Sequence, residues 1–224
     1  MGRDNHPQVR QQRQLARKLG TRPGYPRILI VCEGKKTEPG YFSEIQEEQR
    51  LNTAYVQILH SQLGTSPLRV VESAEELFRS GDPHKRIRKR SFEQVFAVFD
   101  RDDHESYFDA LTKAAQLDGK LRNDVREAVV FRAIASVPCF ELWLLLHYEE
   151  IGHAIHRDEV LRRLKRHIPS YEKGKSGYFA LTKSRLPEAL QRAEKLTKQH
   201  RAHEGREPYT DLGILVQLMT TMKR

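Results

Sequence analysis

Four short apolar runs alternate with helix-like segments through the first two-thirds of the chain, and this alternation restricts the fold more than any other feature. The runs are rich in β-branched and aromatic residues and are bounded by turn-forming residues, which predicts buried strands. We expect the strands at residues 27–32, 55–60, 94–99 and 128–135. Strands separated by helices predict an α/β fold, in which a Rossmann-like parallel sheet is flanked by helices on both faces.

The segments between the runs have the boundaries that helices favour. Pro39 suits the first turn of a helix, where the missing N–H of proline costs nothing. Ser66 is the predicted cap of the next helix, and Gly81 its predicted end. We expect helices at residues 37 to 50, 67–80, 104–117 and 140–148.

The pattern changes after Glu150, where the sequence shows no strand-like run. Helical patterns cover residues 158–167, 187–201 and 211–222, and the Gly/Lys/Tyr segment 171–178 is typical of a loop. We therefore expect three parts. They are a basic, flexible arm at residues 1–26, an α/β domain at 27–150, and a basic helical extension at 151–224 that packs on it.

Charge is distributed unevenly along the 224 residues, which carry 39 Lys and Arg against 30 Asp and Glu. The net charge is +6 over residues 1–27, −5 over 28–150 and +8 over 151–224. Basic segments fit a polyanionic partner such as nucleic acid. A solubilising surface explains an isolated charge run equally well, so composition leaves both readings open.

Other compositional features exclude several classes of protein. No run of 18 apolar residues is present, and residues 1–24 are too polar for a signal peptide, so we expect a soluble cytoplasmic protein without a membrane partner. The two cysteines, Cys32 and Cys139, form neither a disulfide framework nor a zinc motif.

Acidic residues follow two of the predicted strands. Glu33 follows the first strand, Asp100 and Asp102 follow the third, and Glu141 lies where a helix begins after the fourth. Ligands of open parallel sheets bind beyond the carboxyl ends of the strands. Alternate residues of an extended chain point the same way, so Asp100 and Asp102 can face one ion. Acids brought together repel unless a cation separates them, and hard divalent ions prefer oxygen ligands, which predicts a Mg²⁺ or Mn²⁺ site.

Simpler explanations exist for several of these residues. Glu33 alone is explained at least as well by a helix dipole or a surface partner, and Glu38 by a place in a helix first turn. An Asp at a helix start often serves as a cap, although capping needs one Asp and this segment has three. Phosphatases of the haloacid-dehalogenase type and nucleotide-sugar glycosyltransferases also use a strand followed by Asp-x-Asp. Neither normally needs Glu-Gly after the first strand.

Basic residues near the predicted site are candidates for contacting phosphate. Two lie beside Glu33, two lie in the 171–178 loop among tyrosines, and two belong to the dense cluster KRIRKR at residues 85–90. An ordinary solvated loop is the alternative for each pair. The candidates are Lys35, Lys36, Arg86, Arg88, Lys173 and Lys175.

The strand ending in Glu-Gly and the later strand ending in Asp-x-Asp resemble the TOPRIM domain of topoisomerases, primases and OLD-type nucleases. The strings ILIVCEGKKTEPGYF, VFAVFDRDDH and SVPCFELWLLLHYE, with a Tyr-x-Lys segment and a late Pro-x-Thr, resemble the RloB-like family more closely. This family is TOPRIM-related and associated with bacterial restriction and abortive-infection loci. Val137 departs from the pattern, because the family more often has Asn before this proline.

The resemblance implies metal-dependent cleavage or transfer at a phosphodiester. It makes Glu33 a metal ligand or general acid/base and Asp100 and Asp102 the holders of the ion. If two metals are used, Glu38 or Glu141 completes the second position; the sequence leaves one metal or two open. We therefore expect a TOPRIM-type nuclease in anti-phage defence, with Glu33, Asp100, Asp102 and Glu141 as catalytic residues.

Two other functions remain open at this point. The chain could be a non-catalytic nucleic-acid-binding or regulatory subunit of a defence complex. Because the sequence has no Walker-type phosphate loop, any ATPase would be a partner protein. A phosphatase or nucleotidyl transferase acting on a small substrate is the third reading, and it does little to explain the basic segments. The sequence leaves homo-oligomerisation open.

Overall fold

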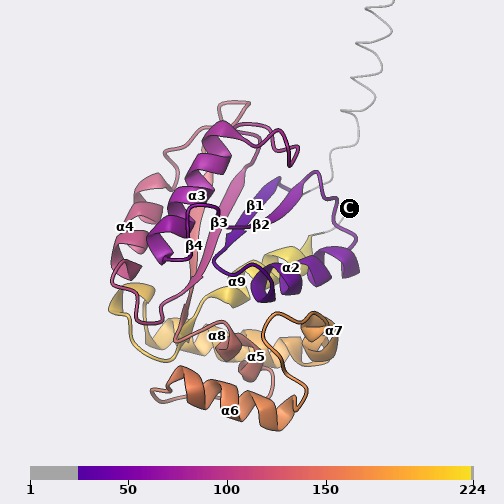
Figure 1. Ribbon diagram of the computed structural model, residues 1–224, viewed down its shortest axis with the longest axis vertical. Coiled ribbons are helices and arrows are strands. Elements are labelled where there is room, and N and C mark those ends of the chain that lie inside the picture. The colour runs from indigo at the N-terminus through magenta and orange to yellow at the C-terminus, as the bar shows by residue number, and fades with distance from the viewer. Residues whose placement is uncertain (1–24, 223–224) are drawn as a thin grey trace, which may run out of the picture.

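The computed structural model describes residues 25–222, so the predicted arm at residues 1–26 lies outside the described residues except for its last two. A five-stranded sheet forms the centre of the molecule, with the strand order β2-β1-β3-β4-β5 (Figure 1). The strands are β1 (Ile28–Cys32), β2 (Val56–His60), β3 (Gln94–Asp100), β4 (Val130–Val137) and β5 (Tyr209–Thr210).

The first four strands are parallel, which confirms the predicted α/β class. The fifth strand is an exception, because β5 pairs antiparallel to β4, with Thr210 opposite Ser136. The expectation of no strand after Glu150 was therefore wrong. Two residues are too few to show the alternation that identifies a strand in a sequence. The hydroxyls of Ser136 and Thr210 lie 3.0 Å apart and hydrogen-bond inside the core.

Helices cover both faces of the sheet, and they begin and end within a few residues of the predicted positions. In Figure 1, α3 and α4 lie on one side of the strands and α2 and α9 on the other, while α5, α6, α7 and α8 gather below. The short helix α7, which directly follows the predicted loop, was not expected. The helices are α2 (Thr37–Glu48), α3 (Pro67–Ser80), α4 (Tyr107–Leu117), α5 (Glu141–Leu146), α6 (Arg157–His167), α7 (Tyr178–Thr182), α8 (Leu186–Gln199) and α9 (Leu212–Thr221).

Alternate residues of the strands pack into two separate hydrophobic cores, one on each face of the sheet. Leu29 and Val31 of β1 pack toward α3 and α4, whereas Ile28 and Ile30 pack on the opposite face. The second core contains the C-terminal helices, and its largest buried side chain is Trp143, whose indole N–H donates a hydrogen bond to the Tyr41 hydroxyl at 2.9 Å. Residues from both halves of the chain therefore share one core.

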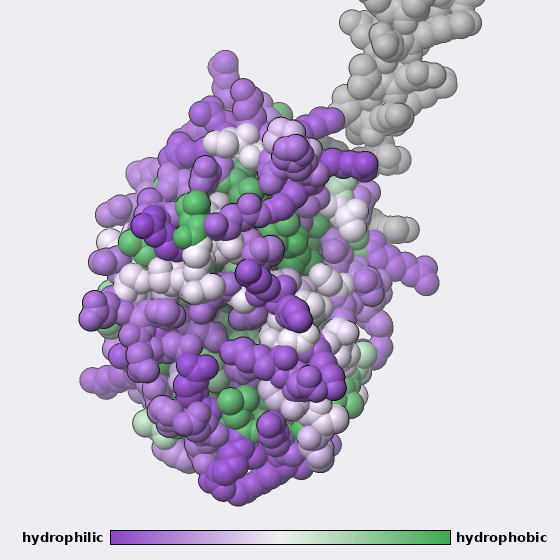
Figure 2. Space-filling model, viewed as in Figure 1, coloured by the Kyte–Doolittle hydropathy of each residue, from purple (hydrophilic) through white to green (hydrophobic). Residues whose placement is uncertain are grey.

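The surface reflects the high charge of the sequence. The face shown in Figure 2 is predominantly hydrophilic, with small apolar areas between hydrophilic side chains. Within residues 25–222, no helix combines the length and the apolar character needed to cross a membrane.

Candidate metal centre

The carboxyl ends of β1 and β3 carry the acids that the sequence singled out. Parallel pairing of β1 with β3 places Glu33 beside Asp100, and the Asp100 N–H donates to Glu33 Oε2 at 3.0 Å. A cleft of about 290 Å³ opens at this edge and is lined by Glu33, Glu38, Asp100 and Asp102. The structure thus brings four of the predicted acids to one cavity.

A smaller group within the cleft has the geometry of a metal site. One ligand atom from each of Glu33, Asp102 and His104 lies within 4.8 Å of the other two. Glu33 Oε1 and His104 Nε2 are 3.9 Å apart, too far for a direct hydrogen bond. Among the described residues this is the one such group of three, and Asp100 is not part of it.

Asp100 and Asp102 both line the cleft, but only Asp102 belongs to the group of three. The backbone around Asp102 explains this difference. Strand β3 ends at Asp100, and Asp102 has a φ of 38°, so the alternation of an extended chain does not continue across the pair. Left-handed backbone at a residue other than glycine costs energy and is concentrated at functional sites. Asp102 Oδ2 pairs with Arg157 Nη1 at 2.9 Å, whereas Asp102 Oδ1 is buried without a hydrogen-bond partner among the described residues.

The other acids form a deeper layer. Asp100, Glu38 and Glu141 are 7%, 7% and 2% exposed, and Glu141 does not line the cleft. Glu141 Oε1 accepts a hydrogen bond from the Tyr171 hydroxyl at 2.7 Å. The predicted metal residues therefore divide between an open group, Glu33 with Asp102, and a buried group, Asp100 with Glu38.

Burial and repulsion between neighbouring acids raise the pKa values of Glu33, Glu38 and Asp100. Burial raises the pKa of Glu33 to about 7, and the charges of Glu38 and Asp102 add to this, while the Asp100 N–H and Lys173 act against it. The pKa of Asp100 is raised by burial and then by Glu38, Glu33 and Glu141. A cation bound in the cleft stabilises the ionised carboxylates and lowers these pKa values.

Gly34 allows Glu38 to fold back over the start of its own helix. A Cβ atom at position 34 would lie 2.2 Å from Glu38 Oε2, inside the space that this carboxylate fills. The Glu38 carboxylate accepts hydrogen bonds from its own N–H and from Gly34, although burial raises its pKa overall. Glycine at position 34 therefore has two roles: it leaves room for the Glu38 carboxylate, and it lets the chain turn after β1.

Two cations from the C-terminal half reach the cleft. Lys173 lines it from the loop after α6. Burial lowers the pKa of Lys173, but the charges of Glu141, Asp100 and Glu38 outweigh burial and raise it. Arg157, the first residue of α6, reaches Asp102 as described above. No ion pair of Lys173 is present among the described residues, so its ammonium is available to a bound anion.

The loop that carries Lys173 is tied to α2 at two points. The Gly174 N–H donates to Thr37 Oγ1 at 3.0 Å. The Glu44 carboxylate accepts from the N–H groups of Gly177, Phe179 and Ala180, which are the unpaired donors at the start of α7. This attachment fixes the position of Lys173 over the acids.

Replacing Glu44 with alanine should loosen the loop. The Glu44→Ala substitution leaves three backbone donors without an acceptor, a cost of about 1–3 kcal/mol, so we expect tryptic cleavage after Lys173 and Lys175 to accelerate about tenfold or more. Glu48→Ala is the matched control, because Glu48 lies one turn further along α2 and forms only an exposed pair with Lys183 at 2.8 Å. Equal cleavage rates in the two variants would contradict the attachment.

The remaining predicted basic residues occupy three different places. Lys35 and Lys36 are exposed at the rim of the cleft. Lys175 is exposed and pairs with Glu172 inside its own loop. Arg86 and Arg88 lie in the loop between α3 and β3, at the amino ends of the strands and therefore at the opposite edge of the sheet from the acids.

Sequence reasoning missed two residues of the site. His104 was assigned to a helix, but α4 begins at Tyr107 and leaves His104 in the preceding turn. The sequence predicted that α6 begins at residue 158, so Arg157 was not assigned to it. Arginine is unfavourable at the positive end of a helix dipole, and this mismatch is the signal that could have marked Arg157 as a functional residue.

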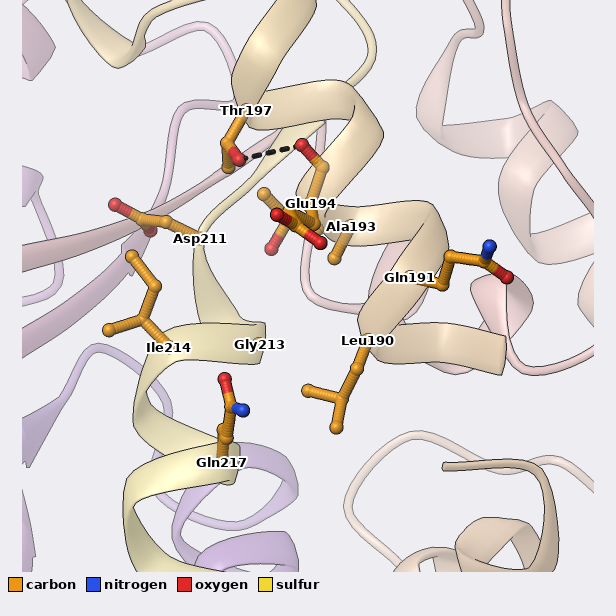
Figure 3. Close-up of a pocket in the computed structure, with 10 residues that line it drawn as sticks. Leu190, Gln191, Ala193, Glu194, Thr197, Asp211, Gly213, Ile214 and Gln217 are labelled. Atoms are coloured by element: carbon orange, nitrogen blue, oxygen red, sulfur yellow. Dashed lines mark hydrogen bonds between the residues drawn. The ribbon is translucent and has the colours of Figure 1, made fainter. Parts of the chain in front are cut away.

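A second cavity, of about 280 Å³, lies between α8 and α9 and contains none of the predicted site residues (Figure 3). The Asp211 carboxylate points away from α8, and its Oδ1 accepts the Ala135 N–H at 2.6 Å. Thr197 donates to the Glu194 backbone carbonyl at 3.0 Å. Because Asp211 is used in the core, this cavity offers no paired acids for chemistry.

Comparison with known proteins is consistent with this arrangement. No curated protein and no solved structure matches the chain. The model of the family described as RloB-like protein matches residues 28–219, which includes every strand, the cleft and both cations of the C-terminal half. The chain belongs to the RloB-like protein family.

Proposed function

We propose that this protein is a metal-dependent nuclease that cleaves nucleic-acid phosphodiesters at the cleft beyond β1 and β3. Two observations carry the proposal: a carboxylate oxygen of Asp102 lies within 4.8 Å of ligand atoms of Glu33 and His104, and Asp102 Oδ1 is buried without a hydrogen-bond partner among the described residues. A buried carboxylate oxygen without a donor is costly unless a cation completes its environment.

The residues present fit a divalent ion. Glu33 and Asp102 supply carboxylate oxygens, and His104 supplies an imidazole nitrogen. Oxygen ligands suit both Mg²⁺ and Mn²⁺, whereas imidazole is a ligand of transition metals more often than of Mg²⁺. Of the two ions expected from the sequence, the set therefore favours Mn²⁺. Bound here, such an ion would polarise a phosphate and stabilise the leaving oxygen.

The protein's own side chains supply binding and orientation. Lys173 lines the cleft and forms no ion pair among the described residues, and we propose that it holds a phosphate oxygen, with Lys35 and Lys36 following the strand at the rim. Arg157 orients Asp102 through their ion pair. Tyr171 holds Glu141, and the negative charge of Glu141 in turn favours the charged form of Lys173. Glu141 is thus proposed as a positioning residue behind the cleft.

The biological setting is part of the proposal. RloB-like membership, together with the family's association with restriction and abortive infection, supports a role in anti-phage defence. We propose nucleic acid as the substrate and an ATPase as a partner protein, because the chain has no phosphate loop of its own. The Asp102–Arg157 pair keeps a non-catalytic nucleic-acid-binding role as the second candidate, since the arginine already offsets the charge of Asp102 without a metal.

A cleavage assay distinguishes these two functions. The full chain is incubated with labelled single- and double-stranded DNA and RNA in Mn²⁺, Mg²⁺ or EDTA. A nuclease should cut at least one substrate with either ion, faster in Mn²⁺, and none in EDTA. Salt-sensitive binding without cleavage under every condition, also in the presence of a co-purified ATPase, would instead establish the binding role.

A further inference from the structure

The opposite edge of the sheet carries a pocket with different chemistry. A cavity of about 550 Å³ lies beside the amino ends of β1, β2 and β3, within the size range of small-molecule sites. Strand β3 has seven residues, so this pocket lies roughly 20 Å from the acidic cleft at the other end of the strands. A ligand here cannot be in contact with the proposed metal site.

Cations dominate the described lining, and no carboxylate belongs to it. Arg86 and Arg88 line the pocket and have no ion pair or side-chain hydrogen bond among the described residues. Lys85 Nζ forms an ion pair with Asp82 Oδ2 at 3.7 Å, and it has no hydrogen bond among the described residues. Arg27 also lines the pocket, but Glu93 and Asp124 occupy its guanidinium. Among the described lining residues, Arg86 and Arg88 therefore remain available to one anion, and Lys85 beside them adds positive charge.

The loop that carries these cations is held in one conformation by backbone hydrogen bonds. Asp82 and Ile87 form a pair of backbone hydrogen bonds, at 2.9 and 2.8 Å, that closes the loop across its base. Arg86 has a φ of 59°, a strained conformation for a residue other than glycine. At Gly81, a Cβ atom would lie 2.5 Å from the Ile87 carbonyl oxygen, so only glycine fits this close approach.

The pocket lining also includes an aromatic ring. Tyr55 lines the same pocket, and its ring packs edge-on against Tyr25 at a centroid distance of 6.2 Å, which fixes its orientation. Thr53, Gln57 and Ser91 add neutral polar groups. Guanidinium groups beside an aromatic ring are the combination that binds a phosphate together with a base.

We propose that this pocket binds a nucleotide, with Arg86 and Arg88 on the phosphate, Lys85 beside them, and Tyr55 against the base. The nucleotide is either free or one unit of a bound nucleic-acid strand. The site is separate from the cleft at the carboxyl edge and does not rest on the proposed nuclease activity.

Calorimetric titrations of the full chain in EDTA at low salt test the proposal. The probes are adenosine monophosphate, adenosine, inorganic phosphate and a single-stranded adenylate pentanucleotide. We expect the monophosphate to bind at least tenfold more tightly than adenosine or phosphate alone. If the pentanucleotide binds but adenosine monophosphate does not, the pocket holds one unit of a nucleic-acid strand rather than a free nucleotide. Binding of neither, or equal binding of phosphate and monophosphate, overturns the proposal.

Matched variants locate the site. Arg86→Gln with Arg88→Gln should weaken binding at least tenfold, whereas Lys89→Gln, in the same loop but outside the lining, should leave it within twofold. Tyr55→Leu should weaken the binding of adenosine monophosphate but not the binding of inorganic phosphate. Asp102→Asn should change nothing, because Asp102 belongs to the other edge of the sheet. Loss of binding in Asp102→Asn, or its retention in the double arginine variant, contradicts the assignment.

Discussion

Replacing Asp102 with asparagine is expected to reduce metal-dependent cleavage about a thousandfold while leaving the fold intact. The substitution keeps the size of the side chain but removes the negative charge of a carboxylate that lies in one group with Glu33 and His104. Loss of a metal ligand removes several kcal/mol of transition-state stabilisation, and each 1.4 kcal/mol is about a factor of ten in rate. Single-turnover cleavage rates in Mn²⁺ measure the effect.

Asp103 provides the control for this experiment. It is the neighbouring residue, is exposed, and lies outside the three-residue group. Asp103→Asn should cleave within a few fold of the unaltered protein. Electron paramagnetic resonance of Mn²⁺ gives a second readout that does not depend on cleavage, since Asp102→Asn should weaken Mn²⁺ binding and Asp103→Asn should not. Equal loss in both variants would mean that general negative charge, rather than ligation, matters here.

The second large effect concerns stability and pH at Asp211. Burial raises the pKa of this carboxyl from 3.8 to about 7, although the Ala135 N–H, its own N–H, the Tyr209 hydroxyl and Arg132 act in the other direction. Below pH 4 both the folded and the unfolded chain hold the proton. As the pH rises toward 7, the unfolded chain releases it first, so the free energy of unfolding falls, and the loss is complete above the folded pKa.

Asp211→Asn removes this titration and keeps an oxygen to accept the Ala135 N–H. The asparagine variant should therefore gain stability relative to the unaltered protein as the pH rises from 5 to 8, by roughly 3 kcal/mol. Urea unfolding at several pH values measures the difference between the two chains. Glu33, Glu38 and Asp100 also titrate with raised pKa values, but they are common to both chains and cancel. A difference that stays constant with pH would contradict the prediction.

Much of the fold was visible in the sequence because its signals are local. The run ending at Cys32 is fully buried in β1, and the helix through Ser80 ends at Gly81 as expected. Strand β5 gave no such signal, since its two residues gain their structure from pairing with β4. Helix α7 likewise begins where Glu44, far away in sequence, binds its free N–H groups.

The candidate site was predictable only in part. Glu33 and Asp102 were found because strand ends in a parallel sheet meet at one edge. The separation of Asp100 from Asp102 depends on one left-handed residue, which no pattern of residue types shows. Arg157 and Lys173 reach the cleft from helices and loops placed by long-range packing. Charge alone also suggested that Arg86 lies near the acids, whereas the strand direction puts it at the far edge.

Strand β5 has a consequence for how the protein is made. It lies close to the end of the chain, yet it completes the sheet beside β4, the strand that leads into Glu141. Lys173 and Arg157 also come from the last third of the sequence. During synthesis the acids of the first half emerge from the ribosome long before the cations and the last strand that complete their surroundings. A chain synthesised only as far as Glu141 therefore holds the acids of the cleft without Arg157 and Lys173.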